Sequence, residues 1–234
     1  MIDPITPIAE RLATVRLRVA RAAESAGRSP GAVRIIAVTK TMPVEAARAA
    51  YDAGARDFGE NRIQEGTAKI AAFGPSDAVW HLIGHLQTNK ARPAARDFGI
   101  IHAIDSVRIA EAVAREATAL GRAIDVLLEV NVAAEESKYG FTPEDALVSS
   151  GNITRLDGLR VIGLMTVAPL VADPEDARLV FRALRLLGER VRERVGNPNV
   201  WHLSMGMSND VDVAIAEGAT MVRIGRAIFG ERPA

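Results

Sequence analysis

One lysine of this sequence stands apart from the others by its position. Of the four lysines among the 234 residues, Lys40 alone directly follows an apolar, β-rich run, VRIIAVT at 33–39. Lys69 and Lys90 fall in segments with a helical pattern, and Lys138 falls in a polar loop. A partly desolvated lysine amine at the end of a strand can attack a carbonyl and form a Schiff base. A solvated lysine, or a point charge that binds phosphate, is the alternative interpretation of Lys40.

Two glycine-containing turns late in the chain have the composition of an anion-binding site. In SMGMSND, residues 204–210, small residues separate an apolar run from a helical pattern that begins near Asn209. The second turn, RIGR at 223–226, combines a glycine with two arginines. Small side chains let backbone N–H groups approach an anion, although ordinary turns and helix caps have the same composition. A strand-end lysine facing a phosphate site indicates a phosphorylated carbonyl compound, either an aldolase substrate or the cofactor pyridoxal 5′-phosphate.

The elements that must position these residues alternate regularly along the chain. An amphipathic helix is predicted over Thr6–Gly27, where apolar residues recur at helical spacing and a glycine ends the pattern. After it, eight short apolar runs are each followed by a helical pattern. The predicted strands are 33–40, 56–59, 79–84, 100–105, 124–132, 159–167, 200–205 and 221–225. The predicted helices are 43–54, 62–72, 88–96, 107–120, 143–150, 174–194, 209–217 and 226–230.

This alternation predicts an α/β protein whose parallel sheet closes into a single (β/α)8 TIM barrel with an extra N-terminal helix. An open doubly wound sheet is less favoured, because no glycine-rich loop follows the first predicted strand. No linker rich in glycine, proline or serine divides the chain, so residues 1–234 are expected to form one domain. Since active sites of such barrels lie at the C-terminal ends of the strands, Lys40 and both turns are expected at one mouth.

Composition and charge exclude several other classes of function. The chain has no cysteine, which excludes disulfide scaffolds, thiolate metal sites and thiol catalysis. Its 29 basic and 29 acidic residues give no general attraction to nucleic acid or to an anionic membrane. The sequence has neither a membrane-spanning run nor a signal-peptide pattern, so a cytoplasmic location is expected. His81 and His85 lack the context of a zinc-protease motif, so no metal site is expected.

Six motifs in order along the chain give a resemblance to a known family. They are AVTK (37–40), GENRIQE (59–65), WHLIGHLQTNK (80–90), GLMTV (163–167), LSMGMSND (203–210) and VRIGRAIFG (222–230). The sequence resembles the pyridoxal phosphate homeostasis proteins, stand-alone barrels similar to the N-terminal domain of alanine racemase. The resemblance implies a protein that binds, buffers and delivers pyridoxal 5′-phosphate through a lysine aldimine, without turnover of its own.

The resemblance also implies which residues surround the cofactor ring. Lys40 would form the internal aldimine. Arg223 would lie beside the pyridine nitrogen, where its positive charge would weaken the ring as an electron sink. Three further residues would line the ring pocket: Asn61, His81 and Met165.

A second group of residues is implied for the cofactor phosphate. Ser204, Gly206 and the backbone around Gly225 would hold it. Arg226 stands where many members of the family have threonine or serine, so a hydroxyl ligand is replaced. We therefore treat the Arg226 guanidinium as a candidate phosphate ligand.

The remaining choice is between a carrier and an amino-acid racemase. Racemisation needs proton-transfer groups on both faces of the bound amino acid. Lys40 could serve one face, whereas Tyr51 is expected on a helix and Tyr139 in a loop, and the barrel is expected to leave no second catalytic domain. Glu129 and Asn131 share a face of the fifth predicted strand and are expected to have a supporting role. We therefore assign no catalytic residue and expect a monomeric carrier, with apoenzymes that need the cofactor as partners and no nucleic acid or membrane.

Overall fold

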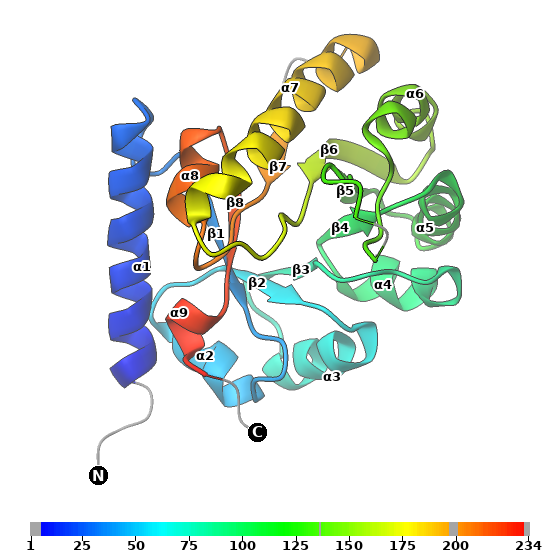
Figure 1. The fold of residues 1–234 in the computed structure, drawn as a ribbon. Coiled ribbons are helices and arrows are strands. Elements are labelled where there is room, and N and C mark those ends of the chain that lie inside the picture. Colours follow the sequence, from blue (N-terminus) through cyan, green and yellow to red (C-terminus); the bar gives the residue numbers. More distant parts are fainter. Residues whose placement is uncertain (1–5, 136, 197–200, 232–234) are drawn as a thin grey trace.

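The chain folds into a closed barrel of eight parallel strands surrounded by helices (Figure 1). A computed structural model describes residues 6–135, 137–196 and 201–231. The strands are hydrogen-bonded in sequence order, and β1 pairs with β8 to close the sheet. The predicted (β/α)8 barrel is confirmed, and the alternative open sheet is wrong.

The strands are short and mostly buried, as expected where helices cover one face and side chains fill the other. All eight overlap a predicted strand. The second prediction is shifted by one residue, and the others run a few residues too long because polar strand ends continue as loops. Residue 200, in the seventh predicted strand, lies outside the described residues. The strands are β1 (Arg34–Val38), β2 (Asp57–Glu60), β3 (Val79–Leu82), β4 (Ile100–Ile104), β5 (Ile124–Glu129), β6 (Leu159–Met165), β7 (His202–Ser204) and β8 (Met221–Ile224).

The helices agree with the predicted segments to within a few residues, and the segments after the third and sixth strands begin as 3₁₀ turns. The side chains of Ser106, Thr142 and Asp173 each accept a backbone N–H at the start of such a segment, which explains where it begins. The helices are α1 (Thr6–Ser25), α2 (Val44–Asp52), α3 (Ile63–Phe73), η1 (Thr88–Lys90), α4 (Ala91–Asp97), α5 (Val107–Ala119), α6 (Pro143–Ile153), η2 (Pro174–Ala177), α7 (Arg178–Val195), α8 (Val211–Ala216) and α9 (Arg226–Phe229).

The barrel has two kinds of buried surface. The larger apolar cluster joins strands and helices, and many of its helical members are alanines that let the helices lie close to the sheet. A separate small cluster contains Ile100, Leu127 and Met165. Leu127 and Glu129 share a face of β5, and Glu129 lies at the mouth, so this cluster lies in the barrel interior.

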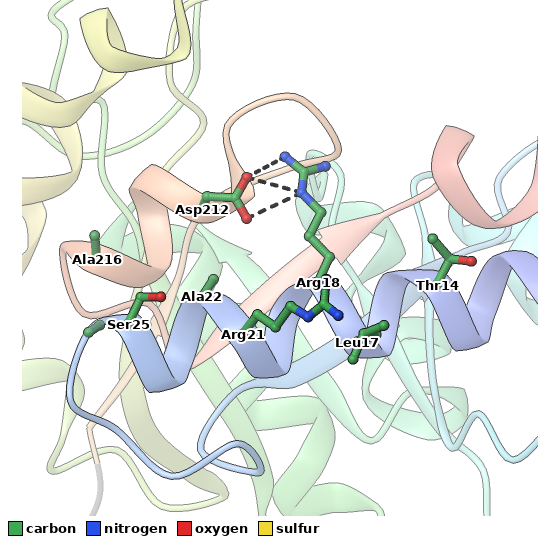
Figure 2. A pocket seen from close by; sticks show the side chains of 9 residues that line it. Thr14, Leu17, Arg18, Arg21, Ala22, Ser25, Asp212 and Ala216 are labelled. Atoms are coloured by element: carbon green, nitrogen blue, oxygen red, sulfur yellow. Dashed lines mark hydrogen bonds and ion pairs between the residues drawn. The ribbon is translucent and has the colours of Figure 1, made fainter.

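The predicted N-terminal helix packs on the outside of the barrel beside α8 and α9 (Figure 1). Its buried face includes Leu12 and Val19, which are 1% and 2% exposed. On the neighbouring face, the Arg18 guanidinium forms a forked ion pair with the Asp212 carboxylate of α8, the shortest contact being 2.6 Å (Figure 2). Among the described residues, no helix is long and apolar enough to cross a membrane.

Candidate functional site

A cavity of about 1220 Å³ opens where the C-terminal ends of the strands meet. It is lined by residues that follow or end most of the strands, from Lys40 after β1 to Gly225 after β8. Four of its lining residues are cationic, namely Lys40, Lys138, Arg223 and Arg226. Four acidic residues, Glu129, Glu135, Asp210 and Glu231, also line the cavity. Lysine and arginine side chains suit a ligand that carries both a carbonyl and a phosphate.

The nine predicted site residues divide into two layers. Five of them line the cavity: Lys40, Asn61, Arg223, Gly225 and Arg226. The other four are buried and do not line it: His81, Met165, Ser204 and Gly206. These four buried residues lie behind the cavity wall, either inside the barrel or behind its loops.

Arg223 forms part of the cavity lining but is only 5% exposed. One guanidinium nitrogen, Nη1, donates to the carbonyl and the hydroxyl of Ser204 at 2.8 and 2.7 Å, and the other, Nη2, donates to the carbonyl of Thr166 at 2.8 Å. Burial lowers the pKa of Arg223 to about 10, although Asp210 and Glu129 oppose the shift. The guanidinium therefore remains charged at neutral pH and is held in one orientation.

The hydroxyl of Ser204 is already engaged inside the barrel. It contacts Arg223 on one side and, at 3.0 Å, Nδ1 of His102 on the other. The other ring nitrogen of His102 contacts His81, and His81 contacts the carboxylate of Asp57 near the opposite end of the barrel. Ser204 and His81 are therefore placed to support Arg223 from below.

The peptide segment that carries Lys40 is fixed by a buried ion pair. The Lys69 ammonium of α3 donates to the Glu60 carboxylate at 2.5 Å and to the Thr39 carbonyl at 2.6 Å. The Thr39 hydroxyl donates to the same Glu60 oxygen at 2.6 Å. Burial raises the pKa of Glu60, while the bonds from Lys69 and Thr39 act in the opposite direction. The turn after β1 is thus tied to β2 and α3.

Thr41, directly after Lys40, adopts a backbone conformation that is uncommon for a residue with a side chain. Its φ is +64°, in the left-handed region, and its N–H donates to Glu65 at 2.5 Å. The preceding Thr39 carbonyl accepts from the N–H of Met42 at 3.0 Å, which closes the turn. Strained backbone held by surrounding contacts is found preferentially at functional sites, and here it directly follows Lys40 in the turn after β1.

Glu129 is a half-buried acidic group of the cavity wall. Burial raises its pKa to about 7, and the nearby Asp105 carboxylate adds to the shift while Arg223 opposes it. One of its carboxylate oxygens, Oε2, has no hydrogen-bond partner among the described residues. The expected supporting role therefore does not account for Glu129, which lies in the cavity as a group that can gain or lose a proton.

Asn131 does have the expected supporting role. Its side-chain amide donates to the carbonyl of Glu135 and accepts from the N–H of the same residue, at 2.8 and 3.2 Å. These bonds shape the loop that brings Lys138 and Tyr139 to the cavity. Tyr139 stacks on His85, with ring centroids 3.6 Å apart, and remains 58% exposed.

Two glycines of the site are required by close approach. A Cβ at Gly84 would lie 2.3 Å from the carbonyl oxygen of Asn61, so this position brings two loops together. Gly206 has a φ of +93°, and a Cβ there would lie 2.5 Å from that of Ala214. Gly206 therefore shapes the turn that presents Met207 and the following residues to the cavity.

A smaller cavity of about 460 Å³ lies away from this mouth, between α1 and α8 (Figure 2). Its walls contain Arg21, Ser25 and the Arg18–Asp212 pair, together with short or apolar side chains. The described residues contain no group of three or more histidine or acidic side chains that could hold a metal ion. The chemistry-bearing side chains are concentrated at the barrel mouth.

Sequence reasoning did not identify Asp57, His102 or the Glu60–Lys69 pair as parts of the site. By sequence, His102 falls in the predicted strand 100–105 and Lys69 in the predicted helix 62–72, so neither was placed in the site. Nothing in a single sequence indicates that these strands bring their polar side chains together inside the barrel. Closure of the barrel, through contacts between residues distant in sequence, creates these pairs.

Comparison with known proteins gives consistent results. The family model described as "Alanine racemase, N-terminal domain" matches residues 11–233. The "Pyridoxal phosphate homeostasis protein" of Aquifex aeolicus is 42% identical over 95% of this chain and 97% of its own, and that of Pseudomonas aeruginosa is 41% identical over 97% of both. The structure of PipY from Synechococcus elongatus with PLP bound is similar, with a TM-score of 0.83 and 38% identity over 95% of this chain and all of that one. Alanine racemase from Bartonella henselae, at 16% identity over 98% of this chain and 61% of its own, shares the fold, with a TM-score of 0.72.

Proposed function

Since this chain belongs to the alanine racemase N-terminal domain family and, within it, to the pyridoxal phosphate homeostasis proteins, we propose that it binds and delivers pyridoxal 5′-phosphate. The observation that carries the proposal is one cavity that is lined both by Lys40 and by the fixed guanidinium of Arg223. The names of the relatives and the bound PLP of PipY support the same cofactor. The cavity volume is ample for it.

The residues present fit this cofactor by their chemistry. When bound, pyridoxal phosphate supplies an aldehyde that reacts reversibly with an amine, and Lys40 would provide that amine. Asn61 would lie beside the ring. Arg223, which has donors only, would face the ring nitrogen and lower its affinity for a proton. The protein would therefore hold the cofactor while leaving it a weak electron sink.

The phosphate would be held by the two turns that the sequence suggested. Ser208 and Gly225 line the cavity and offer backbone groups, whereas the N–H of Met207 already donates to the Asp210 carboxylate. Arg226 also lines it and is exposed, so its guanidinium can approach the phosphate from the solvent side. The Ser204 hydroxyl would act indirectly, because Arg223 and His102 already occupy it.

A carrier without turnover is favoured by the positions of the tyrosines. Tyr51 bonds to Asp77 and is absent from the cavity wall, and Tyr139 is largely exposed at the rim. Neither supplies a desolvated second acid or base opposite Lys40. Glu129 is the observation that favours the alternative, an amino-acid racemase or related enzyme, because its carboxyl changes protonation near neutral pH.

Proton exchange at the α-carbon distinguishes these two functions. The cofactor-loaded protein is incubated with L-alanine, D-alanine and L-serine in deuterated water, and the α-protons are followed by NMR. A carrier produces no exchange above that of free cofactor. Exchange or inversion at a useful rate, lost in Lys40→Ala and in Glu129→Gln, would establish the enzyme instead.

Delivery is tested by transfer to the apo form of a cofactor-dependent enzyme. We expect the loaded protein to restore that enzyme's activity, and size-exclusion chromatography with light scattering to give the mass of a monomer. A cytoplasmic location and transfer to apoenzymes are part of the same proposal. Failure to release cofactor to any of several apoenzymes would contradict the delivery role.

A further inference from the structure

A continuous file of polar side chains runs through the interior of the barrel, beneath the proposed cofactor site. It connects Arg223 to Ser204 at 2.7 Å, Ser204 to His102 at 3.0 Å, His102 to His81 at 2.9 Å and His81 to Asp57 at 2.9 Å. Both histidines and the serine have no exposed surface. At the far end, Arg34 lies 3.6 Å from the Asp57 carboxylate.

The two ends of this file determine the direction of every hydrogen bond in it. A guanidinium only donates and a carboxylate only accepts. Since Arg223 donates to the Ser204 oxygen, the Ser204 hydroxyl is able to donate to Nδ1 of His102. His102 then donates from Nε2 to Nδ1 of His81, and His81 donates from Nε2 to Asp57. With both imidazoles neutral, this is the arrangement in which each contact has one donor and one acceptor.

Reversing the bonds would leave a conflict at Asp57. If His81 donated to His102 from Nδ1, a neutral His81 would present the lone pair of Nε2 to the carboxylate. A second proton on His81 would remove that conflict, but it would place a positive charge in a fully buried position. Burial lowers the pKa of both histidines, although Asp57 opposes the shift at His81. At His102 the interactions with His81 and Arg223 add to the lowering of the pKa. The neutral, one-directional file is therefore favoured.

We propose that His81 and His102, through Ser204, are positioning residues that hold the Arg223 guanidinium as a fixed donor at the floor of the cavity, in a hydrogen-bond file that runs one way to Asp57. Their role at the ring nitrogen rests on the proposed binding of pyridoxal phosphate. The file itself is a property of the protein without cofactor. It explains why five polar side chains occupy an interior that apolar residues could fill.

The direction of the file is measured in the cofactor-free protein by NMR of ¹⁵N-labelled histidine. The chain has four histidines, and the variants His85→Gln and His202→Gln identify the two signals outside the file. From about pH 6 to 8, we expect His81 and His102 to be neutral, with the proton on Nε2 and Nδ1 unprotonated. A proton on Nδ1 of either residue, as the other tautomer or as imidazolium, would overturn the proposal.

The effect on the site is measured with Ser204→Ala and His102→Leu after cofactor loading. We expect the visible absorbance maximum to shift and the Kd for the cofactor to rise about tenfold, because a hydrogen bond to a charged group is lost. Leu127→Met is the matched control, since it alters a neighbouring interior side chain without touching the file. Wild-type spectra and Kd values in both folded variants would overturn the positioning role.

The two measurements separate this inference from the proposed function. If the wild-type protein takes up no cofactor, the proposed function fails, and the histidine tautomers still decide the direction of the file. If a variant does not fold, its thermal unfolding shows this and the tautomer measurement again decides. If cofactor binds and the tautomers are reversed, the proposed function stands and the inference is wrong.

Discussion

Glu129 is the acidic side chain of the barrel mouth whose protonation state is most sensitive to its surroundings. Its pKa is raised from 4.5 to about 7, chiefly by burial, so the folded protein holds this proton at pH values where the unfolded chain has released it. The free energy of unfolding must therefore fall as pH rises between these two values. The loss expected from this one group is about 3 kcal/mol at most.

We predict that Glu129→Gln removes this pH dependence in the cofactor-free protein. Relative to the wild type, the variant should gain stability between about pH 5 and pH 8, by about 1–3 kcal/mol, in urea unfolding at a series of pH values. The comparison at the acid end serves as the control, since Glu129 is protonated there and resembles glutamine. An equal difference at both ends of the range would contradict the raised pKa.

Sequence position predicted some side chains of the site better than others, for a geometric reason. Lys40 and Asn61 follow the last residues of β1 and β2, so the strand-end rule placed them correctly at the cavity. His81 lies within β3 and is buried one layer below. Arg223 also lies within its strand but lines the cavity, because its side chain is long. Whether a side chain reaches the cavity depends on its length and on its height in the barrel. The sequence gives only the residue type and the approximate end of each strand.

At the scale of elements, the junction of β1, β2 and α3 depends on the Glu60–Lys69 ion pair. Both side chains are almost completely buried, so removal of one partner leaves a charged group with little solvation. We predict that Lys69→Met lowers the free energy of unfolding by about 3–5 kcal/mol. The double variant Lys69→Met with Glu60→Leu should recover part of that loss, because no buried charge remains. A single variant that loses less than about 1 kcal/mol would show that the pair does not hold this junction.

The turn between β7 and α8 requires a glycine at position 206. Gly206→Ala combines a positive φ with a contact that Ala214 cannot accommodate. We predict a loss of about 3 kcal/mol in stability, from strain and overpacking together, and weaker cofactor binding. Gly196→Ala is the matched control, because Gly196 has a φ of +64° with open space around it, and it should lose about 1 kcal/mol. Equal losses in the two variants would mean that the contact with Ala214 is relieved at little cost.

At the scale of the whole molecule, the alternation of apolar runs and helical patterns was sufficient to predict the barrel. A parallel sheet covered by helices produces continuous apolar strands, and the short loops leave few other ways to connect them. The exterior helix α1 was also predicted, from its apolar face, but its partner was not. The Arg18–Asp212 pair joins residues 194 positions apart (Figure 2). The interior file joins five strands. Such contacts depend on closure of the sheet, which sequence periodicity does not specify in detail.

The central claim, that Lys40 is the residue through which the protein holds pyridoxal phosphate, is tested most directly by chemical trapping. The purified protein is loaded with the cofactor, reduced with borohydride, digested and examined by mass spectrometry. We predict a pyridoxyl-phosphate modification on Lys40, retained in Lys138→Ala, which alters another lysine of the same cavity, and loss of the visible absorbance band in Lys40→Ala. Modification of a different lysine, or a visible band that persists in Lys40→Ala, would contradict the claim.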